Sequence, residues 1–191
     1  SIAGDLPERH VLWRLVQDHE DPNLLFLGTE FGVFFTVDSG ERWVKLTGGA
    51  PTIPFRDLAI QRRENDLVGA TFGRSFYVLD DYSPLREVDE ALLEQEATLF
   101  GVKDTWWYLP KRPLGRSAKA TQGHGFFHAE NPPFGAIFTY YLRDNLETRK
   151  AERREKEKEI QKEGGDNPYP GWDAMRDEAR EEEPTMLLTV R

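Results

Sequence analysis

Short apolar stretches alternate with polar turns along the chain from Val11 to about Asp81. The stretches are rich in β-branched and aromatic residues, which is typical of strands, and the Pro, Asn, Asp and Gly residues between them are typical of turns. The alternation of strands and turns predicts an antiparallel meander. The expected strands are Val11–Gln17, Leu24–Gly28, Gly32–Val37, Trp43–Leu46, Arg56–Gln61, Asp66–Thr71 and Ser75–Asp80.

An internal repeat connects two parts of this meander. The segment 29–38 can be laid over the segment 71–80 at an offset of 42 residues, with Thr, Phe and Asp identical at matching positions (Thr29/Thr71, Phe34/Phe76 and Asp38/Asp80). Four strands in a repeat of about 40–45 residues is the period of a β-propeller blade. We therefore expect two four-stranded blades, over roughly 9–50 and 51–101. A propeller needs at least about four blades, so further blades must come from elsewhere in the protein or from another chain.

One turn has a recognisable pattern, Ser/Thr-x-Asp-x-Gly-x-x-Trp, which the residues Thr36, Asp38, Gly40 and Trp43 fit without a mismatch. In such a turn the Asp carboxylate accepts backbone N–H groups, Gly supplies a backbone with φ > 0, and Trp packs beneath. We therefore assign these four residues a structural role. The second repeat has Asp80-Asp81-Tyr-Ser-Pro84 at this place and lacks the Gly and the Trp.

This turn resembles the Asp-box (bacterial neuraminidase) repeats of sialidase-like and sortilin-like β-propellers, where the box is a structural hairpin on the rim. Further short motifs in matching order extend the resemblance over roughly residues 1–90: Gly28–Gly32, Arg56–Ile60, Glu64–Leu67, Gly73–Ser75 and Leu79–Leu85. The resemblance implies the last blades of a bacterial propeller that is often described as glycosyl-hydrolase-like. It also implies an exported protein, periplasmic or extracellular.

The chain after the second repeat has a different composition. Residues 102–130 are basic and Gly-rich and read as a linker, and Pro132-Pro133 precedes a strand-like stretch that ends at Leu142. Most residues from Arg143 to Glu163 are charged, with oppositely charged pairs at helical spacing, and an acidic helix is expected over Trp172–Glu183. Met186–Val190 reads as a second strand. The resemblance implies that 131–191 begins an immunoglobulin/fibronectin-III-like sandwich with a helical hairpin insertion at 143–183, following the propeller blades at 1–101.

Composition excludes several classes of function. The net charge is −9 and Lys and Arg do not cluster, which argues against a nucleic-acid surface. There is no Cys, so disulfides and thiolate chemistry are excluded. No apolar run is long enough for membrane insertion. The chain begins without Met or a signal-like segment and ends on an apolar run, so we expect a fragment whose partners include the missing upstream blades and downstream Ig-like strands.

Candidate catalytic residues are few. Arg56 and Asp57 follow Pro54 at the start of a strand expected to line the propeller channel, which is the best location for a site. Sialidases use three arginines, a tyrosine nucleophile and an acid/base carboxylate, and Arg56, Arg74 and Tyr77 supply two of these residue types. Asp80 and Asp81 are adjacent in a strand, so they point to opposite faces and do not form a carboxylate pair.

Other chemistry-bearing residues favour simpler interpretations. His124 and His128 have the spacing of a metal pair only in a helix, which the neighbouring Gly123 and Gly125 disfavour, so no metal site is expected. Trp106-Trp107-Tyr108 is either a sugar-stacking platform or a packing element. No nucleotide-binding or Gly-x-Ser-x-Gly motif is present, and no cofactor is expected.

Three functions remain open. The first is a binding or scaffold module for a polysaccharide or peptide, and the second is a glycoside hydrolase of sialidase-like type. The third is a structural subunit of a larger assembly, suggested by the charged arm at 143–163. An enzyme requires two carboxylates, or an arginine trio with Tyr, in one pocket.

Overall fold

The computed structural model describes residues 2–109 and 134–189. It is mainly β, built from antiparallel sheets with few helices, as the sequence pattern predicted. The chain divides into two compact units, Ser1–Tyr141 and Leu142–Arg191. The finer division into blades, linker and Ig-like domain stays a prediction.

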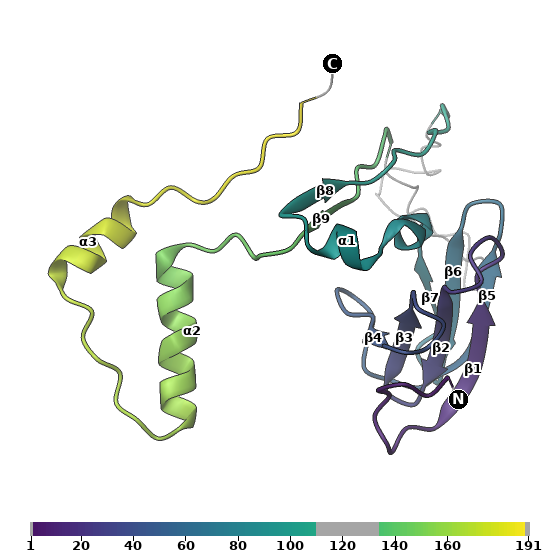
Figure 1. The fold of residues 1–191 in the computed structure, drawn as a ribbon, viewed down its shortest axis with the longest axis horizontal. Helices are drawn as coiled ribbons and strands as arrows, with labels where there is room; N and C mark the ends of the chain where they lie inside the picture. Colours follow the sequence, from purple (N-terminus) through teal and green to yellow (C-terminus); the bar gives the residue numbers. More distant parts are fainter. Residues whose placement is uncertain (1, 110–133, 190–191) are drawn as a thin grey trace, which may run out of the picture. The chain divides into compact units, whose positions relative to one another are not determined.

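Two meanders make up most of the first unit (Figure 1). Sheet A contains four strands in chain order: β1 (Leu12–Gln17), β2 (Leu25–Thr29), β3 (Gly32–Thr36) and β4 (Val44–Lys45). Sheet B contains three: β5 (Phe55–Gln61), β6 (Asp66–Thr71) and β7 (Phe76–Leu79). All the strands expected up to Asp80 are therefore formed, within one or two residues at their ends.

The expected fourth strand of the second repeat is not part of sheet B. A 3₁₀ helix η1 (Ser83–Glu87) and a short helix α1 (Glu90–Leu93) follow β7. The next strand, β8 (Ala97–Leu99), pairs with β9 (Tyr140–Leu142) in a separate two-stranded sheet. Within residues 2–109 and 134–189, sheet B therefore has one strand fewer than sheet A.

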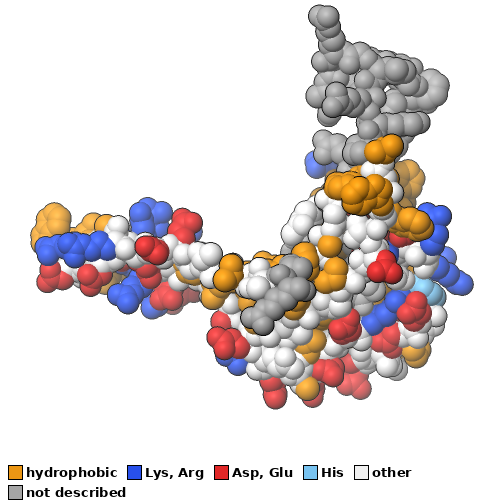
Figure 2. Space-filling view, turned by 90° about the horizontal axis from the view of Figure 1, so that it is seen from above, with side chains coloured by type: hydrophobic (Ala, Val, Ile, Leu, Met, Phe, Trp, Pro, Cys, Tyr) orange, Lys and Arg blue, Asp and Glu red, His pale blue; other side chains and the backbone are white. Residues whose placement is uncertain are grey.

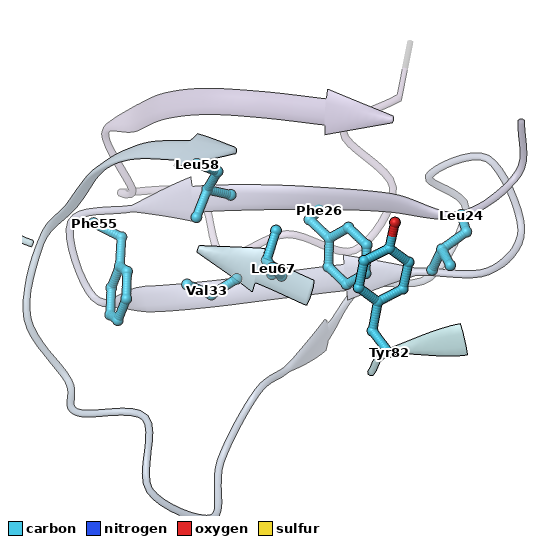
Figure 3. Packing of buried hydrophobic residues seen from close by; sticks show 7 residues of the cluster. All are labelled: Leu24, Phe26, Val33, Phe55, Leu58, Leu67 and Tyr82. Atoms are coloured by element: carbon cyan, nitrogen blue, oxygen red, sulfur yellow. The ribbon is translucent and has the colours of Figure 1, made fainter. Parts of the chain in front are cut away.

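The main core lies between the two sheets (Figure 3). Side chains alternate between the faces of a strand, so every second residue of each sheet enters this layer. Two glycines make room for Phe55. A Cβ on Gly28 of sheet A would lie 2.7 Å from the Phe55 carbonyl oxygen of sheet B, and one on Gly69, in the same sheet as Phe55, would lie 2.7 Å from its ring. The buried members of this core are Leu24, Phe26, Val33, Phe55, Leu58, Leu67 and Tyr82.

A smaller cluster covers part of the opposite face of sheet A. It consists of Leu25, Leu27, Phe34 and Trp43, with Leu6 packed against it. The N-terminal segment is tied down here because Trp43 donates its backbone N–H to Asp5 Oδ1 at 2.7 Å and its indole N–H to the Ile2 carbonyl at 3.0 Å.

The two repeats differ in the length of one hairpin. Two residues connect β2 to β3, since Thr29 pairs with Gly32, but three residues separate Thr71 from Ser75 in the β6–β7 turn. An added residue slips the register and turns every following side chain to the other face. Phe34 is thus 6% exposed and Phe76 is 69% exposed, although they match in the sequence repeat. The offset of 42 residues therefore does not hold through the third strand.

The second unit contains the two expected helices with shorter bounds, α2 (Arg149–Lys162) and α3 (Trp172–Arg180). Arg153 joins them through hydrogen bonds to both carboxylate oxygens of Glu178 at 2.6 and 2.8 Å. Acidic and basic side chains are interspersed over this unit, at the left of Figure 2. The strand expected over Met186–Val190 was wrong in its described part, because residues 186–189 have no strand to pair with among the described residues.

Candidate functional site

The first strands of the two sheets, β1 and β5, lie beside each other (Figure 1). Each contains a register shift at an equivalent place, between Leu12 and Arg14 in β1 and between Phe55 and Asp57 in β5. A β-bulge leaves its extra residue out of the ladder and redirects the side chain. The extra residues are Trp13 and Arg56.

These two bulge residues are in contact. The guanidinium carbon of Arg56 lies 3.8 Å from the centre of the Trp13 ring and 5.1 Å from that of Phe72, which is a cation–π geometry. Beside them Arg14 Nε lies 3.3 Å from Asp57 Oδ1. All five side chains are exposed, so aromatic faces and charged groups share one accessible edge, which we call the β1/β5 edge.

The β1/β5 edge has the chemistry of a binding surface. Aromatic rings stack on apolar faces of ligands, and a guanidinium donates several N–H groups to ligand oxygens. The Arg56 guanidinium forms no hydrogen bond and no ion pair with any other residue that the structure describes. The Arg14–Asp57 pair is solvent-exposed and is therefore worth only about 0–1 kcal/mol, so a ligand can open it at little cost.

The structure places two of the four catalytic candidates together. Arg56 and Asp57 lie on the β1/β5 edge, and Arg74 is exposed in the β6–β7 turn. Tyr77 packs against the core, with its ring centre 5.9 Å from that of Phe55. Arg56 and Tyr77 therefore have different neighbours.

Sequence reasoning missed the contribution of β1 to this edge. Trp13 and Arg14 lie 43 residues before Arg56 and Asp57, at the same structural place of the preceding repeat. Extending the repeat back to its first strand would have identified them.

The turn from Thr36 to Trp43 is held by Asp38. Its Oδ1 accepts hydrogen bonds from the Thr36 hydroxyl at 2.6 Å and from the backbone N–H groups of Glu41 and Arg42 at 2.9 Å each. Burial alone would raise the pKa of Asp38, but these bonds and one from the Arg42 side chain outweigh it and lower the pKa to about 2. Gly40 has φ 95° and Trp43 is buried. The carboxylate is thus engaged by its own turn.

A second polar cluster lies where the two sheets meet, around the buried carboxylate of Asp18. The Asp18 carboxylate accepts hydrogen bonds from the Tyr82 hydroxyl at 2.6 Å and from Arg86 Nε and Nη2 at 2.7 and 2.9 Å. Arg86 also donates to Glu20 at 2.7 Å and to Asn65 at 2.9 Å. We call these five residues the Asp18 cluster.

The Asp18 cluster is a structural link. Burial would raise the pKa of Asp18, but the bonds from Arg86, Tyr82 and two backbone N–H groups outweigh it and hold the pKa well below its usual range. Burial and the bond to Asp18 raise the pKa of the Tyr82 hydroxyl. The structure has a cavity of about 340 Å³ next to β1 and another of about 240 Å³ between the sheets. No residue of the Asp18 cluster lines either of them. No local motif marked it, because Asp18 precedes Tyr82 and Arg86 by 64 and 68 positions.

The remaining candidates from the sequence are the pair His124/His128 and the aromatic residues Trp106 to Tyr108. The described residues contain no group of three or more His, Asp or Glu that could hold a metal, while His124 and His128 lie outside them, as does most of the expected linker. Trp106 and Trp107 are 73% and 86% exposed. Within 2–109 and 134–189, no helix has the length and apolar character needed to cross a membrane.

Comparison with known proteins leaves the family open. No protein-family model matches the sequence, and no curated protein or solved structure is significantly similar to it.

Proposed function

We propose that this chain is part of a sortilin/sialidase-like β-propeller that binds a polysaccharide or a peptide at the β1/β5 edge. The observation that carries the proposal is the Arg56 guanidinium held 3.8 Å over the Trp13 ring, beside the exposed Arg14–Asp57 pair. Such an edge offers a stacking surface together with unengaged hydrogen-bond donors, which suits a ligand with flat apolar faces and oxygen acceptors.

Three features support the propeller part of the proposal. Two antiparallel meanders follow each other in the chain, their first strands are neighbours, and both first strands carry a bulge at the same place. In a propeller the first strand of each blade lines the central channel, so the β1/β5 edge would face it. The exported location and the Ig-like domain after residue 131 rest on the same resemblance.

The neighbours of the candidate residues favour binding over hydrolysis. The sialidase-like alternative needs Tyr77 beside the arginines, but the Tyr77 ring packs on Phe55. It also needs an acid/base carboxylate, and the β1/β5 edge offers Asp57 alone for this role. A ligand that stacks on Trp13 requires neither group to react.

The test is a binding assay with the 191-residue chain. Insoluble cellulose, chitin and xylan and an immobilised peptide library serve as probes, with bound protein measured after washing. For a probe that retains the wild type, Trp13→Ala and Arg56→Ala should each weaken binding at least about tenfold, the effect of losing a stacking or charged contact of about 1.4 kcal/mol.

Two exposed residues away from the edge supply matched controls, Trp172→Ala in the second unit and Arg62→Ala in the β5–β6 turn. Both should bind like the wild type. Equal binding by Trp13→Ala and the wild type would remove the β1/β5 edge from consideration. Release of soluble sugar from a polysaccharide probe would instead support the glycoside hydrolase alternative.

A further inference from the structure

The cavity of about 340 Å³ next to β1 adjoins the β1/β5 edge, and we call it the β1 cavity. Its volume lies within the range of about 300–1,000 Å³ that is usual for ligand sites. Trp13 lines the cavity and also contacts Arg56. Arg14 lines it too and pairs with Asp57, so a ligand bound at the edge also reaches the cavity. Most of the remaining lining is formed by Ile2, Leu6, Leu12, Leu15, Leu27 and Trp43.

The β1 cavity is open to solvent and is bounded by the chain itself. Ile2 and Leu12 are 49% and 51% exposed, whereas Leu27 and Trp43 are buried. The N-terminal segment is fixed to this face of sheet A, because the Trp43 indole N–H is donated to the Ile2 carbonyl at 3.0 Å. Since this segment lies on the sheet, another sheet could not pack flat over the cavity.

The lining of the β1 cavity suits an apolar group better than a sugar. Arg14 is the only charged side chain among the described residues that line it, and the Trp43 indole N–H is already engaged. A sugar ring carries hydroxyl groups around its edge, and each one that enters a site without hydrogen-bond partners loses its bonds to water. An apolar side chain loses none and gains from burial. The cavity therefore favours a peptide side chain over a saccharide.

The charge of the β1/β5 edge favours an acidic group beside that side chain. Arg14 and Asp57 offset each other, while the Arg56 guanidinium forms no ion pair with any other described residue. The edge thus has one uncompensated positive charge next to the cavity. A carboxylate accepts charge-assisted hydrogen bonds from a guanidinium, and these are stronger than bonds between neutral groups.

We infer that the β1/β5 edge and the β1 cavity together bind an extended acidic peptide, with one large apolar side chain in the cavity and a neighbouring Asp or Glu on Arg56. This inference rests on the function proposed above and selects a peptide over a polysaccharide as the ligand. Trp13 lines the cavity and carries Arg56, so the two subsites are one side chain apart. Peptide residues one to three positions apart, about 3–10 Å along an extended chain, reach both.

Fluorescence anisotropy with the 191-residue chain tests the inference. The probes are labelled eight-residue peptides of Ser and Gly that contain one Phe and one Glu, placed one, two or three positions apart. At least one of them should bind the wild type. Replacing its Phe by Ser, or its Glu by Gln, should raise the Kd at least tenfold.

Variants of the protein assign each peptide group to its subsite. With Arg56→Ala the Glu and Gln peptides should bind equally, because the partner of the carboxylate is gone. With Leu15→Ser the Phe peptide should lose at least tenfold in affinity, and Leu12→Ser replaces this variant if its circular dichroism spectrum differs from that of the wild type. Arg62→Ala and Val78→Ser are the matched controls, exposed in the β5–β6 turn and in β7, and should leave every Kd unchanged.

The outcomes separate this inference from the function on which it rests. A polysaccharide that binds through Trp13 while no Phe/Glu peptide binds would overturn the peptide ligand and leave the β1/β5 edge as a binding site. Absence of binding to peptides and polysaccharides alike would overturn both proposals. Equal binding of the Glu and Gln peptides by the wild type would remove the acidic requirement and contradict the inference. Self-association of the wild type that Leu15→Ser abolishes, measured by sedimentation velocity, would show a second copy in the cavity and would also contradict it.

Discussion

Replacement of Arg86 by Ala should strongly destabilise the first unit. Arg86 makes two hydrogen bonds to Asp18 and one each to Glu20 and Asn65, and the Asp18 side chain has no solvent exposure. The substitution leaves a buried carboxylate without its cation. Breaking a buried ion pair on one side costs about 3–5 kcal/mol. Urea unfolding of the wild type and the variant at pH 7 measures this difference.

The pH dependence of the difference in unfolding free energy between wild type and Arg86→Ala shows whether the Asp18 carboxylate causes it. The pKa of Asp18 in the folded wild type lies below its unfolded value of 3.8, so its stabilising contribution is present above that pH and is lost as the pH falls. Without Arg86, burial penalises the ionised carboxylate and works against folding at neutral pH. The stability difference between wild type and Arg86→Ala should therefore be largest at pH 7 and shrink as the pH falls below about 4.

Arg62→Ala is the control, since Arg62 is exposed in the β5–β6 turn. It should change stability by less than about 0.5 kcal/mol. If Arg86→Ala costs less than about 1 kcal/mol at pH 7, or if its cost is the same at pH 3, the Asp18 cluster does not link the sheets as described.

Three further predictions concern single elements. Gly69→Ala should cost about 1–3 kcal/mol in urea unfolding because the new Cβ meets the Phe55 ring, whereas Gly101→Ala, which meets only ordinary contacts, should be close to neutral. Asp38→Asn should lower stability by about 1–2 kcal/mol at pH 7, and its difference from the wild type should disappear as the pH falls from about 4 toward 2, because the folded pKa is lowered to about 2. Arg153→Met removes the pairs that join α2 to α3 and should increase amide hydrogen exchange in α3; unchanged exchange would mean that the pairs do not hold the helix.

The seven strands up to Asp80 were predictable because their signals are local. Apolar periodicity and turn residues gave each strand to within one or two residues, and the pattern at Thr36–Trp43 predicted a carboxylate that accepts turn N–H groups. The helices α2 and α3 were predictable for the same reason, whereas η1 and α1 were not expected from the sequence. The Met186–Val190 strand failed since a strand also needs a neighbour, which sequence periodicity does not supply.

The candidate site was predictable only in part. Arg56 and Asp57 were identified from their place at the start of a strand, but Trp13 and Arg14 were not. Tyr77 was grouped with Arg56 by residue type, and the structure gives it a core neighbour instead. Residue type indicates possible chemistry, whereas the contacts of a side chain depend on which sheet face it occupies.

The sequence by itself determined the strand order, the turn chemistry and the mainly β class, because these depend on interactions between residues close in the chain. Only the tertiary structure decided that Phe34 is buried and that its repeat partner Phe76 is exposed. The β6–β7 turn has one residue more than the β2–β3 turn, and this turns the Phe76 side chain to the other face of its sheet. It also decided that Asp18 meets Arg86 and that Trp13 meets Arg56. These contacts join residues far apart in the chain, and they form only when the two sheets pack.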